Sequence, residues 1–466
     1  MDILSAMRHE LLLVFILIIL LIMKIAGKAE DNAFVTKLVN FMLFVNCIVG
    51  WFPVVTINLF GNMFCNNELL QFEKNILSTG TFLITLFSSG WFQKQRHLPE
   101  FFMLMITALM GMFMMISSGN LLMFYLAIEI SAIPVAALCN FNFSERRSSE
   151  AAMKMIFSSA FSSCLMLLGI SFLYGATGSL DYSAFKVAVI SPLFMTGFIF
   201  FFAGIIFKLS VVPFHFWTAD VYEGSPIAVT AFLSVISKGA MVFVFCNILY
   251  DTFHLLRDEW YFMLSVLSVI TMVTGNLFAI RQQNLKRFLA FSSITQVGFI
   301  LIGISGGREL GITTSVYFII VYMFSNLAAF AVISRISELT GKETINDYKG
   351  LVQSNPVLAW SMAIALFSLA GIPPTAGFFG KIFLLTSGAN EGNYLLISIA
   401  ALNMMVSLYY YLRVIRSMFM EQGSGIPVLN SGNSFKLAMF VCLTGIIVTG
   451  FFGGVYEYIH SLSILH

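Results

Sequence analysis

Charged residues are scarce in this chain: they make up 10% of its 466 residues, whereas hydrophobic residues make up 59%. A soluble domain normally carries about 25% charged residues. With 25 Lys and Arg against 23 Asp and Glu, the net charge is only +2, and no basic cluster points to a nucleic-acid partner. The composition excludes an ordinary soluble domain and predicts an all-α polytopic membrane protein surrounded by the lipid bilayer.

Cysteine is also scarce, and the six cysteines include no Cys-x-x-Cys pair. The spacing gives no indication of a haem, iron–sulfur or zinc site, so no cofactor and no metal is expected in this chain. The first apolar run follows Asp2, Arg8 and Glu10 without a small-residue cleavage site. It is therefore expected to be kept as a membrane span.

A membrane span needs about 20 mostly apolar residues, and about fourteen segments qualify. They are 10–27, 38–59, 76–92, 101–116, 121–138, 151–174, 191–217, 226–250, 260–280, 288–304, 312–336, 357–385, 394–418 and 437–455. No soluble domain or long linker interrupts them. The sequence therefore predicts a bundle of about fourteen transmembrane helices.

Basic residues are distributed unequally between alternate loops. Loops after odd-numbered spans, with their flanks, hold Lys24, Lys28, Lys37, Lys94, Arg96, Arg146, Arg147, Lys154, Arg281, Lys286, Arg287, Arg335, Lys342, Lys349, Arg413, Arg416 and Lys436. The other loops hold Arg8, Lys74, Lys186, Arg257 and Arg308. The positive-inside rule then predicts that the odd loops face the cytoplasm and both termini lie outside.

Three lysines, Lys208, Lys238 and Lys381, lie inside predicted spans, and Glu129 in YLAIEISAIP is the clearest acidic residue in such a place. A lysine at the centre of a membrane helix costs about 3 kcal/mol on insertion scales, and such residues usually mark ion or proton paths. Two of the lysines lie in one stretch, FKLSVVPFHFWTADVYEGSPIAVTAFLSVISKGA. The stretch is therefore the expected centre of the functional site.

Spans 7 and 12 are predicted to be discontinuous, because Pro213 follows Lys208, and Pro373 and Pro374 precede Lys381. Broken backbone at membrane depth is tolerated where it is buried in protein or lines a cavity. Breaks five spans apart predict two inverted five-helix repeats, spans 4–8 and 9–13, as in many transporters; ordinary proline kinks are the alternative. The expected divisions are 1–98 (helices 1–3), 99–250 (first repeat), 251–420 (second, inverted repeat) and 421–466 (last helix).

Glu129 and Lys208 are expected to form a proton switch. At about 4 Å and an effective dielectric constant of about 20, the attraction between two such charges is about 4 kcal/mol. Lys208 would hold its proton while a charged Glu129 is close and release it when the two separate. The alternative is a static salt bridge that holds spans 5 and 7 together.

Lys238 is interpreted as the next position on the proton path, and His215 as a carrier between it and Lys208. The alternatives are a lysine that snorkels to the lipid interface and a histidine that caps a helix. Lys381 is expected to be the counterpart of Lys208 in the second repeat. It has no matching glutamate, so the route would be completed by waters and by polar residues of span 10: Ser292, Ser293, Thr295 and Gln296.

Five motifs resemble the antiporter-like membrane subunits of respiratory complex I. They are FKLSVVPFHFWTADVYEGSP, GNLFAIRQQNLKRFLAFSSITQVGF, LFSLAGIPPTAGFFGK, YYYLRVIRSMF and EAAMKMIFSSAFSSCLMLLGISFLYGATGSL. The resemblance extends from about span 4 to span 13 and is greatest to the subunit N branch. Ser234 stands where the L and M branches and the sodium/proton antiporters typically carry histidine, and Lys381 stands where the M branch carries glutamate. No long lateral helix like that of the L branch is expected here, which also favours the N branch.

The resemblance implies a proton-translocating subunit of an NADH:quinone oxidoreductase in the bacterial inner membrane, with both termini periplasmic. Glu129 and Lys208 would be the family's charged pair, Lys238 the central lysine and Lys381 the outlet residue. NADH, FMN, iron–sulfur clusters and quinone would bind to other subunits, which would be its partners in the membrane arm. Two other functions stay open: a subunit of a multisubunit cation/proton antiporter, and a passive scaffold.

Overall fold

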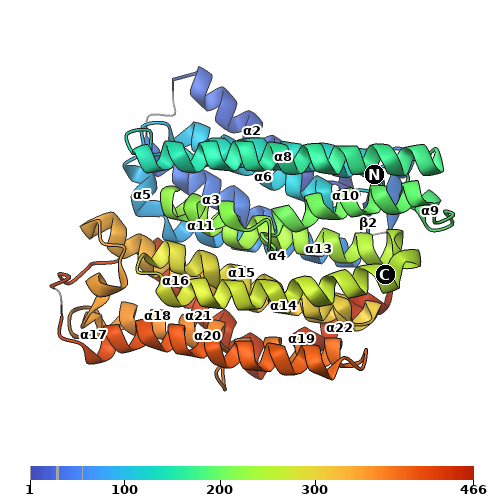
Figure 1. The fold of residues 1–466 in the computed structure, drawn as a ribbon. Helices are drawn as coiled ribbons and strands as arrows, with labels where there is room; N and C mark the ends of the chain where they lie inside the picture. Colours follow the sequence, from blue (N-terminus) through green and yellow to red (C-terminus); the bar gives the residue numbers. More distant parts are fainter. Residues whose placement is uncertain (1, 28–30, 55, 424, 466) are drawn as a thin grey trace.

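Long helices run side by side along one common direction (Figure 1). This computed structural model describes residues 2–27, 31–54, 56–423 and 425–465. The first part of the chain forms α1 Asp2–Ala6, α2 Arg8–Ile25, α3 Asn32–Val49, α4 Glu68–Phe87, α5 Ser89–Gln93, α6 Leu98–Ile116, α7 Leu121–Cys139, α8 Arg146–Thr177, α9 Tyr182–Phe185, α10 Pro192–Lys208 and α11 Phe216–Gly224. Strands β1 Ile57–Leu59 and β2 Phe64–Asn66 lie between α3 and α4.

The rest of the chain is helical too. It forms α12 Ile227–Ala231, the π-helical turn η1 Phe232–Ser237, α13 Lys238–Asn247, the π-helical turn η2 Ile248–Thr252, the 3₁₀ turn η3 His254–Leu256, α14 Arg257–Arg281, α15 Leu285–Ser305, α16 Arg308–Thr340, the 3₁₀ turn η4 Ile345–Tyr348, α17 Leu351–Ser354, α18 Pro356–Ala370, α19 Ala376–Ala389, α20 Tyr394–Met420, α21 Asn433–Phe451 and α22 Gly454–Leu465. The prediction of a mostly helical membrane protein is confirmed.

Ten helical segments of the described chain are long and apolar enough to cross a membrane. The other predicted spans correspond to α2, to the more polar α4 and to two pairs of half-helices, α10 with α11 and α18 with α19. Each of the fourteen predicted segments thus coincides with a helix or a pair of half-helices. A total of fourteen spans stays a prediction.

The predicted span 38–59 is wrong in its second half. Helix α3 ends at Val49, and β1 pairs with β2 in a short antiparallel hairpin. Pro53 cannot donate the backbone hydrogen bond that a continuing helix requires. Gly61 takes a positive φ of 64° at the hairpin turn, a conformation that glycine adopts readily. The apolar sequence around this turn hid the end of the helix.

Both predicted breaks are present. Span 7 is divided between α10 and α11, and span 12 between α18 and α19. Ser210 takes a φ of 63° in the first break and Gly371 a φ of 84° in the second. A left-handed residue followed by proline ends a helix, because the helical hydrogen bonds cannot continue through either residue.

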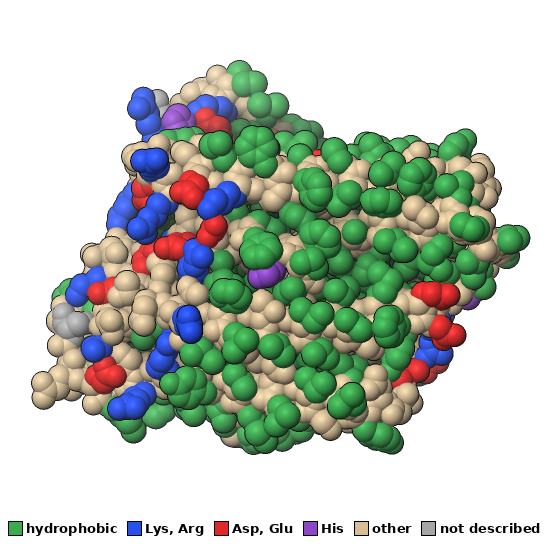
Figure 2. All heavy atoms as spheres, in the orientation of Figure 1, with side chains coloured by type: hydrophobic (Ala, Val, Ile, Leu, Met, Phe, Trp, Pro, Cys, Tyr) green, Lys and Arg blue, Asp and Glu red, His purple; other side chains and the backbone are tan. Residues whose placement is uncertain are grey.

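Charged side chains gather at one end of the bundle in the view of Figure 2, and a broad band of hydrophobic side chains covers the middle. Both termini lie at the opposite end (Figure 1). This arrangement follows the predicted asymmetry of the loops, although Lys28, one of the basic residues that carried it, lies outside the described residues. Which end faces the cytoplasm stays a prediction.

Lys74, which the sequence placed at the flank of the predicted span 76–92, lies inside a helix that begins earlier than predicted. Helix α4 begins at Glu68, because the side chain of Asn67 accepts the backbone N–H of Leu70 at 2.8 Å and caps the helix. Lys74 lies in the second turn of this helix and is fully buried. Lys74 is therefore a buried lysine inside a helix, as Lys238 and Lys381 are.

Candidate functional site

The predicted site residues occupy the interior of the bundle to different degrees. Lys238 and Lys381 are 3% and 1% exposed, whereas Glu129 and Lys208 are only partly buried. Lys208 is the last residue of α10, and Lys381 lies in the second turn of α19. The two lysines thus flank their breaks from opposite sides.

Glu129 and Lys208 are joined through α8 and form no ion pair within 4 Å. The Lys208 Nζ donates to the Ser159 Oγ at 2.6 Å. The Ser163 hydroxyl donates to the Glu129 carboxylate. Ser159 and Ser163 are four residues apart on α8, so they lie on one face of that helix. The structure thus places two hydroxyl groups between the carboxylate and the ammonium group.

A small cavity lies beside Lys208. It has a volume of about 20 Å³ and is lined by Lys208, by Ser131 of α7 and by Ser237 of η1, among mostly apolar neighbours. Such a volume is enough for about one water molecule. Ser237 is the residue before Lys238 in the chain, so the cavity lies one residue away from the next lysine along the chain.

Lys238 follows the π-helical turn η1, an irregularity that is often found at functional sites. Its Nζ donates to the Ser293 Oγ on α15 at 2.7 Å and lies 5.5 Å from the centre of the Tyr222 ring. The buried Ser234 hydroxyl lies 2.9 Å from the Tyr322 hydroxyl. No acidic side chain pairs with Lys238 within 4 Å in the described chain. Its charge is therefore balanced only by hydroxyl groups and an aromatic face.

Polar side chains continue from Lys238 toward Lys381. Next to Ser293 on α15, the Ser292 hydroxyl lies 2.5 Å from the Tyr411 hydroxyl. The Gln296 Nε2 donates to the Tyr411 hydroxyl and to the Leu369 carbonyl oxygen, both at 3.1 Å. Ser292, Ser293 and Gln296, the residues proposed from the sequence to complete the route, thus lie between the two lysines.

Lys381 ends this row. Its Nζ donates to the carbonyl oxygens of Leu369 and Ala370 at 2.8 and 3.1 Å, and lies 5.0 Å from the Phe299 ring centre. These carbonyls belong to the last turn of α18, where helix carbonyls lack partners within the helix and carry partial negative charge. The broken helix therefore supplies the acceptors that the missing glutamate would have supplied.

Two predicted residues lie apart from the row. The Thr295 hydroxyl donates to the Asn276 Oδ1 at 3.2 Å, which belongs to a separate polar group between α14 and α20. The His215 ring contacts Phe216 and Phe278, and its Nδ1 has no hydrogen-bond partner among the described residues. His215 occupies the N-cap position of α11 without a side-chain cap bond. The geometry therefore supports neither the proton carrier nor the capping histidine.

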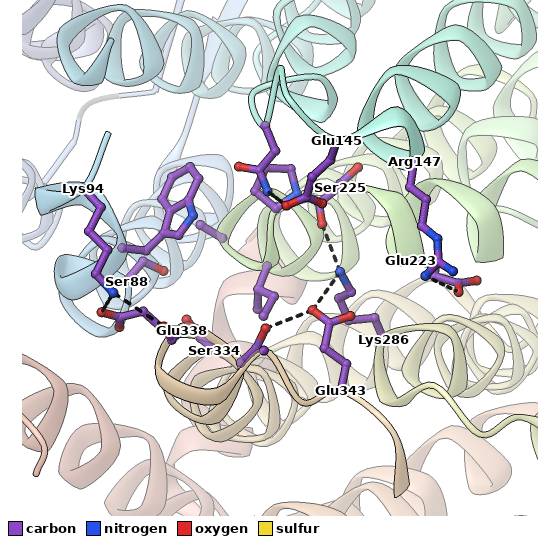
Figure 3. Close-up of a pocket in the computed structure, with 17 residues that line it drawn as sticks. Ser88, Lys94, Glu145, Arg147, Glu223, Ser225, Lys286, Ser334, Glu338 and Glu343 are labelled. Carbon is purple, nitrogen blue, oxygen red and sulfur yellow. Dashed lines mark hydrogen bonds and ion pairs between the residues drawn. The ribbon is translucent and has the colours of Figure 1, made fainter. Parts of the chain in front are cut away.

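A hollow lies at the charge-rich end of the bundle (Figure 2). It has a volume of about 400 Å³, and its lining includes Lys94, Glu223, Lys286, Glu338 and Glu343 (Figure 3). At its floor, the Lys286 Nζ lies 3.2 Å from a Glu343 carboxylate oxygen and donates to the Ser225 carbonyl oxygen at 3.4 Å. The residues that follow Ser225 begin α12, which continues through η1 to Lys238.

The sequence reasoning missed a buried ion pair near the N-terminus. The Lys74 Nζ lies 2.6 Å from the Glu10 Oε1, and the neighbouring Glu73 is fully buried. The polar start of α4 could have revealed it, because Glu73 and Lys74 lie within a helix that an asparagine cap begins. No group of three or more His, Cys, Asp or Glu side chains suited to a metal occurs in the part of the chain that the structure describes.

Comparison of the sequence with known protein families identifies a match. Residues 118–407 match the model of the family described as NADH:quinone oxidoreductase/Mrp antiporter, transmembrane. The matched segment includes more than half of the chain. The chain belongs to this family. All four predicted relay residues, Glu129, Lys208, Lys238 and Lys381, lie inside the matched segment.

Individual members of the family cover nearly the whole chain. NADH-quinone oxidoreductase subunit N of Azobacteroides pseudotrichonymphae is 46% identical over 87% of this chain and 86% of its own length. Subunit N of Phocaeicola vulgatus is 39% identical over 98% of both chains. A chain of respiratory complex I from Thermus thermophilus, solved with bound aureothin, superposes with a TM-score of 0.81 at 25% identity over 96% of this chain and 97% of that one. The predicted resemblance to subunit N is confirmed.

Proposed function

We propose that this chain is a membrane-arm subunit of a bacterial NADH:quinone oxidoreductase and moves protons along Glu129, Lys208, Lys238 and Lys381. Redox chemistry would take place in partner subunits that hold NADH, FMN, iron–sulfur clusters and quinone, and this chain would hold no redox centre. The subunit would lie in the inner membrane with both termini on the periplasmic side. Residues 99–250 and 251–420 would be the two inverted halves.

The row of polar groups from Lys238 to Lys381 carries this proposal. Lys238 contacts Ser293, and the next residue in the chain, Ser292, begins a second set of short contacts that continues through Tyr411 to Gln296 inside the hydrophobic bundle. Each hydroxyl can both accept and donate a hydrogen bond, as a proton relay through water requires. A scaffold would need ion pairs to hold its helices, whereas these two lysines have no acidic partner within 4 Å in the described chain.

The proposal is tested by Lys208→Ala in the assembled complex. Without the ammonium group, the link between Glu129 and the cavity at Ser237 is lost, and proton translocation driven by NADH oxidation is expected to fall about tenfold or more. The measurement is proton uptake per electron in closed membrane vesicles. Lys186→Ala removes an exposed lysine and is the matched control.

Unchanged proton uptake in a normally assembled Lys208→Ala complex would exclude the role of this lysine. The pair Glu129→Gln with Lys208→Met separates the relay from a scaffold, because it removes both charges at nearly constant volume. Full pumping by this double variant would favour the scaffold.

Tyr411→Phe should interrupt the row between the two buried lysines. Its hydroxyl contacts both Ser292 and Gln296, so we expect the rate of proton translocation to fall about tenfold. Tyr410→Phe is the matched control: Tyr410 is equally buried on the same helix, but its hydroxyl bonds to Asn276. Equal pumping by both variants would contradict the predicted route.

A cation/proton antiporter subunit is the second candidate, because the matching family includes Mrp antiporters as well as NADH:quinone oxidoreductases. The two functions differ in their driving force. Sodium-dependent proton exchange by the purified chain in vesicles, without redox partners, would favour the antiporter. Co-purification with an NADH-oxidising assembly would favour the oxidoreductase.

A further inference from the structure

Helix α19 begins without a cap of its own, at the break that holds Lys381. The first backbone N–H groups of a helix have no partner within the helix, and the side chain at the N-cap position usually accepts one of them. Thr375 occupies that position in α19 but makes no capping bond. Its hydroxyl donates instead to the Ile372 carbonyl oxygen at 2.7 Å. The beginning of α19 therefore needs an acceptor from another element.

Ser368 of α18 supplies this acceptor. Gly377 is the second residue of α19, and its N–H donates to the Ser368 Oγ at 3.2 Å. Ser368 is 1% exposed. The two half-helices are in direct contact at this point, since a Cβ atom at Gly377 would lie 3.1 Å from the same Oγ. One half-helix thus caps the other across the break.

A third helix holds the Ser368 hydroxyl in place. The hydroxyl of Ser325 on α16 donates to the Ser368 Oγ at 2.7 Å, and Ser325 is fully buried. A hydroxyl oxygen has two acceptor lone pairs, so Ser368 accepts from Ser325 and from the Gly377 N–H together. Hydrogen bonds that share a group in a low-dielectric interior strengthen one another. Helices α16, α18 and α19 therefore meet at one hydroxyl oxygen.

The cap lies next to the acceptors of Lys381. Ser368 directly precedes Leu369 and Ala370, whose carbonyl oxygens accept from the Lys381 Nζ. On the other half-helix, Gly377 lies four residues before Lys381, so the two residues are on one face of α19. The capping bond and the lysine contacts thus join the same two half-helices, about one turn of α19 apart.

We propose that Ser368 is a positioning residue for proton transfer at Lys381. By capping α19 from α18, its hydroxyl keeps the Lys381 ammonium group within hydrogen-bond distance of the carbonyl end of α18. This inference rests on the proposed function, and it adds to the relay an uncharged residue that does not itself carry the proton. The competing interpretation is a buried serine that only packs the helices together, as small residues commonly do between membrane helices.

Ser368→Ala tests the role of the hydroxyl, because alanine keeps nearly the same volume without an acceptor. The first turn of α19 then loses its cap, and Lys381 is held less firmly against the end of α18. Loss of a cap typically shifts an equilibrium at a helix end by about fivefold, so we expect the rate of proton translocation per assembled complex to fall severalfold. Ser361→Ala is the matched control: Ser361 is 3% exposed on the same helix, but its hydroxyl donates to the Val357 carbonyl oxygen of that helix.

A threonine variant separates positioning from packing. Ser368→Thr keeps the hydroxyl and adds a methyl group, so positioning by the hydroxyl predicts a faster rate than in Ser368→Ala. Packing alone predicts the reverse order, because an added methyl group overfills a buried site. Ser325→Ala leaves the cap but removes the donor that fixes it, and should give an intermediate rate.

An unchanged rate in Ser368→Ala would overturn the inference, and so would an equal loss in Ser361→Ala. Should Ser368→Ala fail to assemble, Ser325→Ala is measured in its place, and a normal rate in it would overturn the inference equally. Failure of the proposed function looks different, because Lys208→Ala would then translocate protons normally. A loss in Lys208→Ala together with a normal rate in Ser368→Ala would remove only the positioning role.

Discussion

Replacing Lys238 by methionine is expected to abolish proton translocation in an assembled complex. Lys238 is the only lysine of the proposed relay that lies between the two broken helices, and its Nζ contacts Ser293, the first group of the polar row. Methionine has a similar length but cannot carry a proton. General acid–base groups contribute about 100-fold to 10,000-fold to proton-transfer steps, so we expect a loss of at least about 100-fold.

The measurement is proton uptake by closed vesicles during NADH oxidation, together with the amount of assembled complex. Loss of the buried charge removes a desolvation cost, so Lys238→Met should assemble at least as well as the unchanged chain. Lys37→Met, at an exposed position of α3, is the matched control. Normal pumping by Lys238→Met would show that protons bypass this position, and the relay would have to be abandoned.

Replacing Gly377 by alanine is expected to lower the amount of assembled complex severalfold. A Cβ atom at Gly377 would lie 1.7 Å from the Ser368 carbonyl oxygen. Because the obstacle is backbone, no side-chain rotation can relieve it, and α18 and α19 would have to move apart. Overpacking of a buried site typically costs about 1–3 kcal/mol and occasionally more. Here the cost falls on the break that holds Lys381.

The amount of subunit retained in the purified complex measures this effect, and a severalfold loss is expected. Gly307→Ala is the matched control, because a Cβ there meets nothing within 4 Å and its φ of −65° suits alanine. Equal amounts of both variants would mean that the two half-helices are not held as closely as the structure shows. Any Gly377→Ala complex that does form should also pump poorly, since the contacts of Lys381 with Leu369 and Ala370 depend on this packing.

Much of the fold could be predicted because apolar length and proline are strong local signals. The discontinuity at Pro213 and the one at Pro373 were readable in this way, and so was the position of the lysines beside them. The hairpin after Val49 was not, because its apolar residues continue the hydrophobic pattern of α3. The beginning of α4 was predicted too late along the chain. Charged residues in its first turns suggested that the helix had not yet begun, although Asn67 caps it there.

The candidate site was predictable as a set of residues, but its geometry was not. A charged residue within an apolar span stands out in the sequence, whereas its partners come from helices far away along the chain. Tyr411 is 119 residues from Ser292, and no local pattern joins them. The serines of α8 were overlooked for the same reason, so a direct pair of Glu129 and Lys208 was expected where two hydroxyl groups intervene.

The ammonium group of Lys381 rests on the open carbonyl end of α18, although the lysine itself belongs to α19. The electrostatic stabilisation of this ammonium group therefore depends on the angle between helices α18 and α19. A tilt of one helix by a few degrees would move the carbonyl dipoles of α18 away from the ammonium group and stabilise the protonated lysine less. A change in the angle between α18 and α19 would therefore change the proton affinity of Lys381 directly.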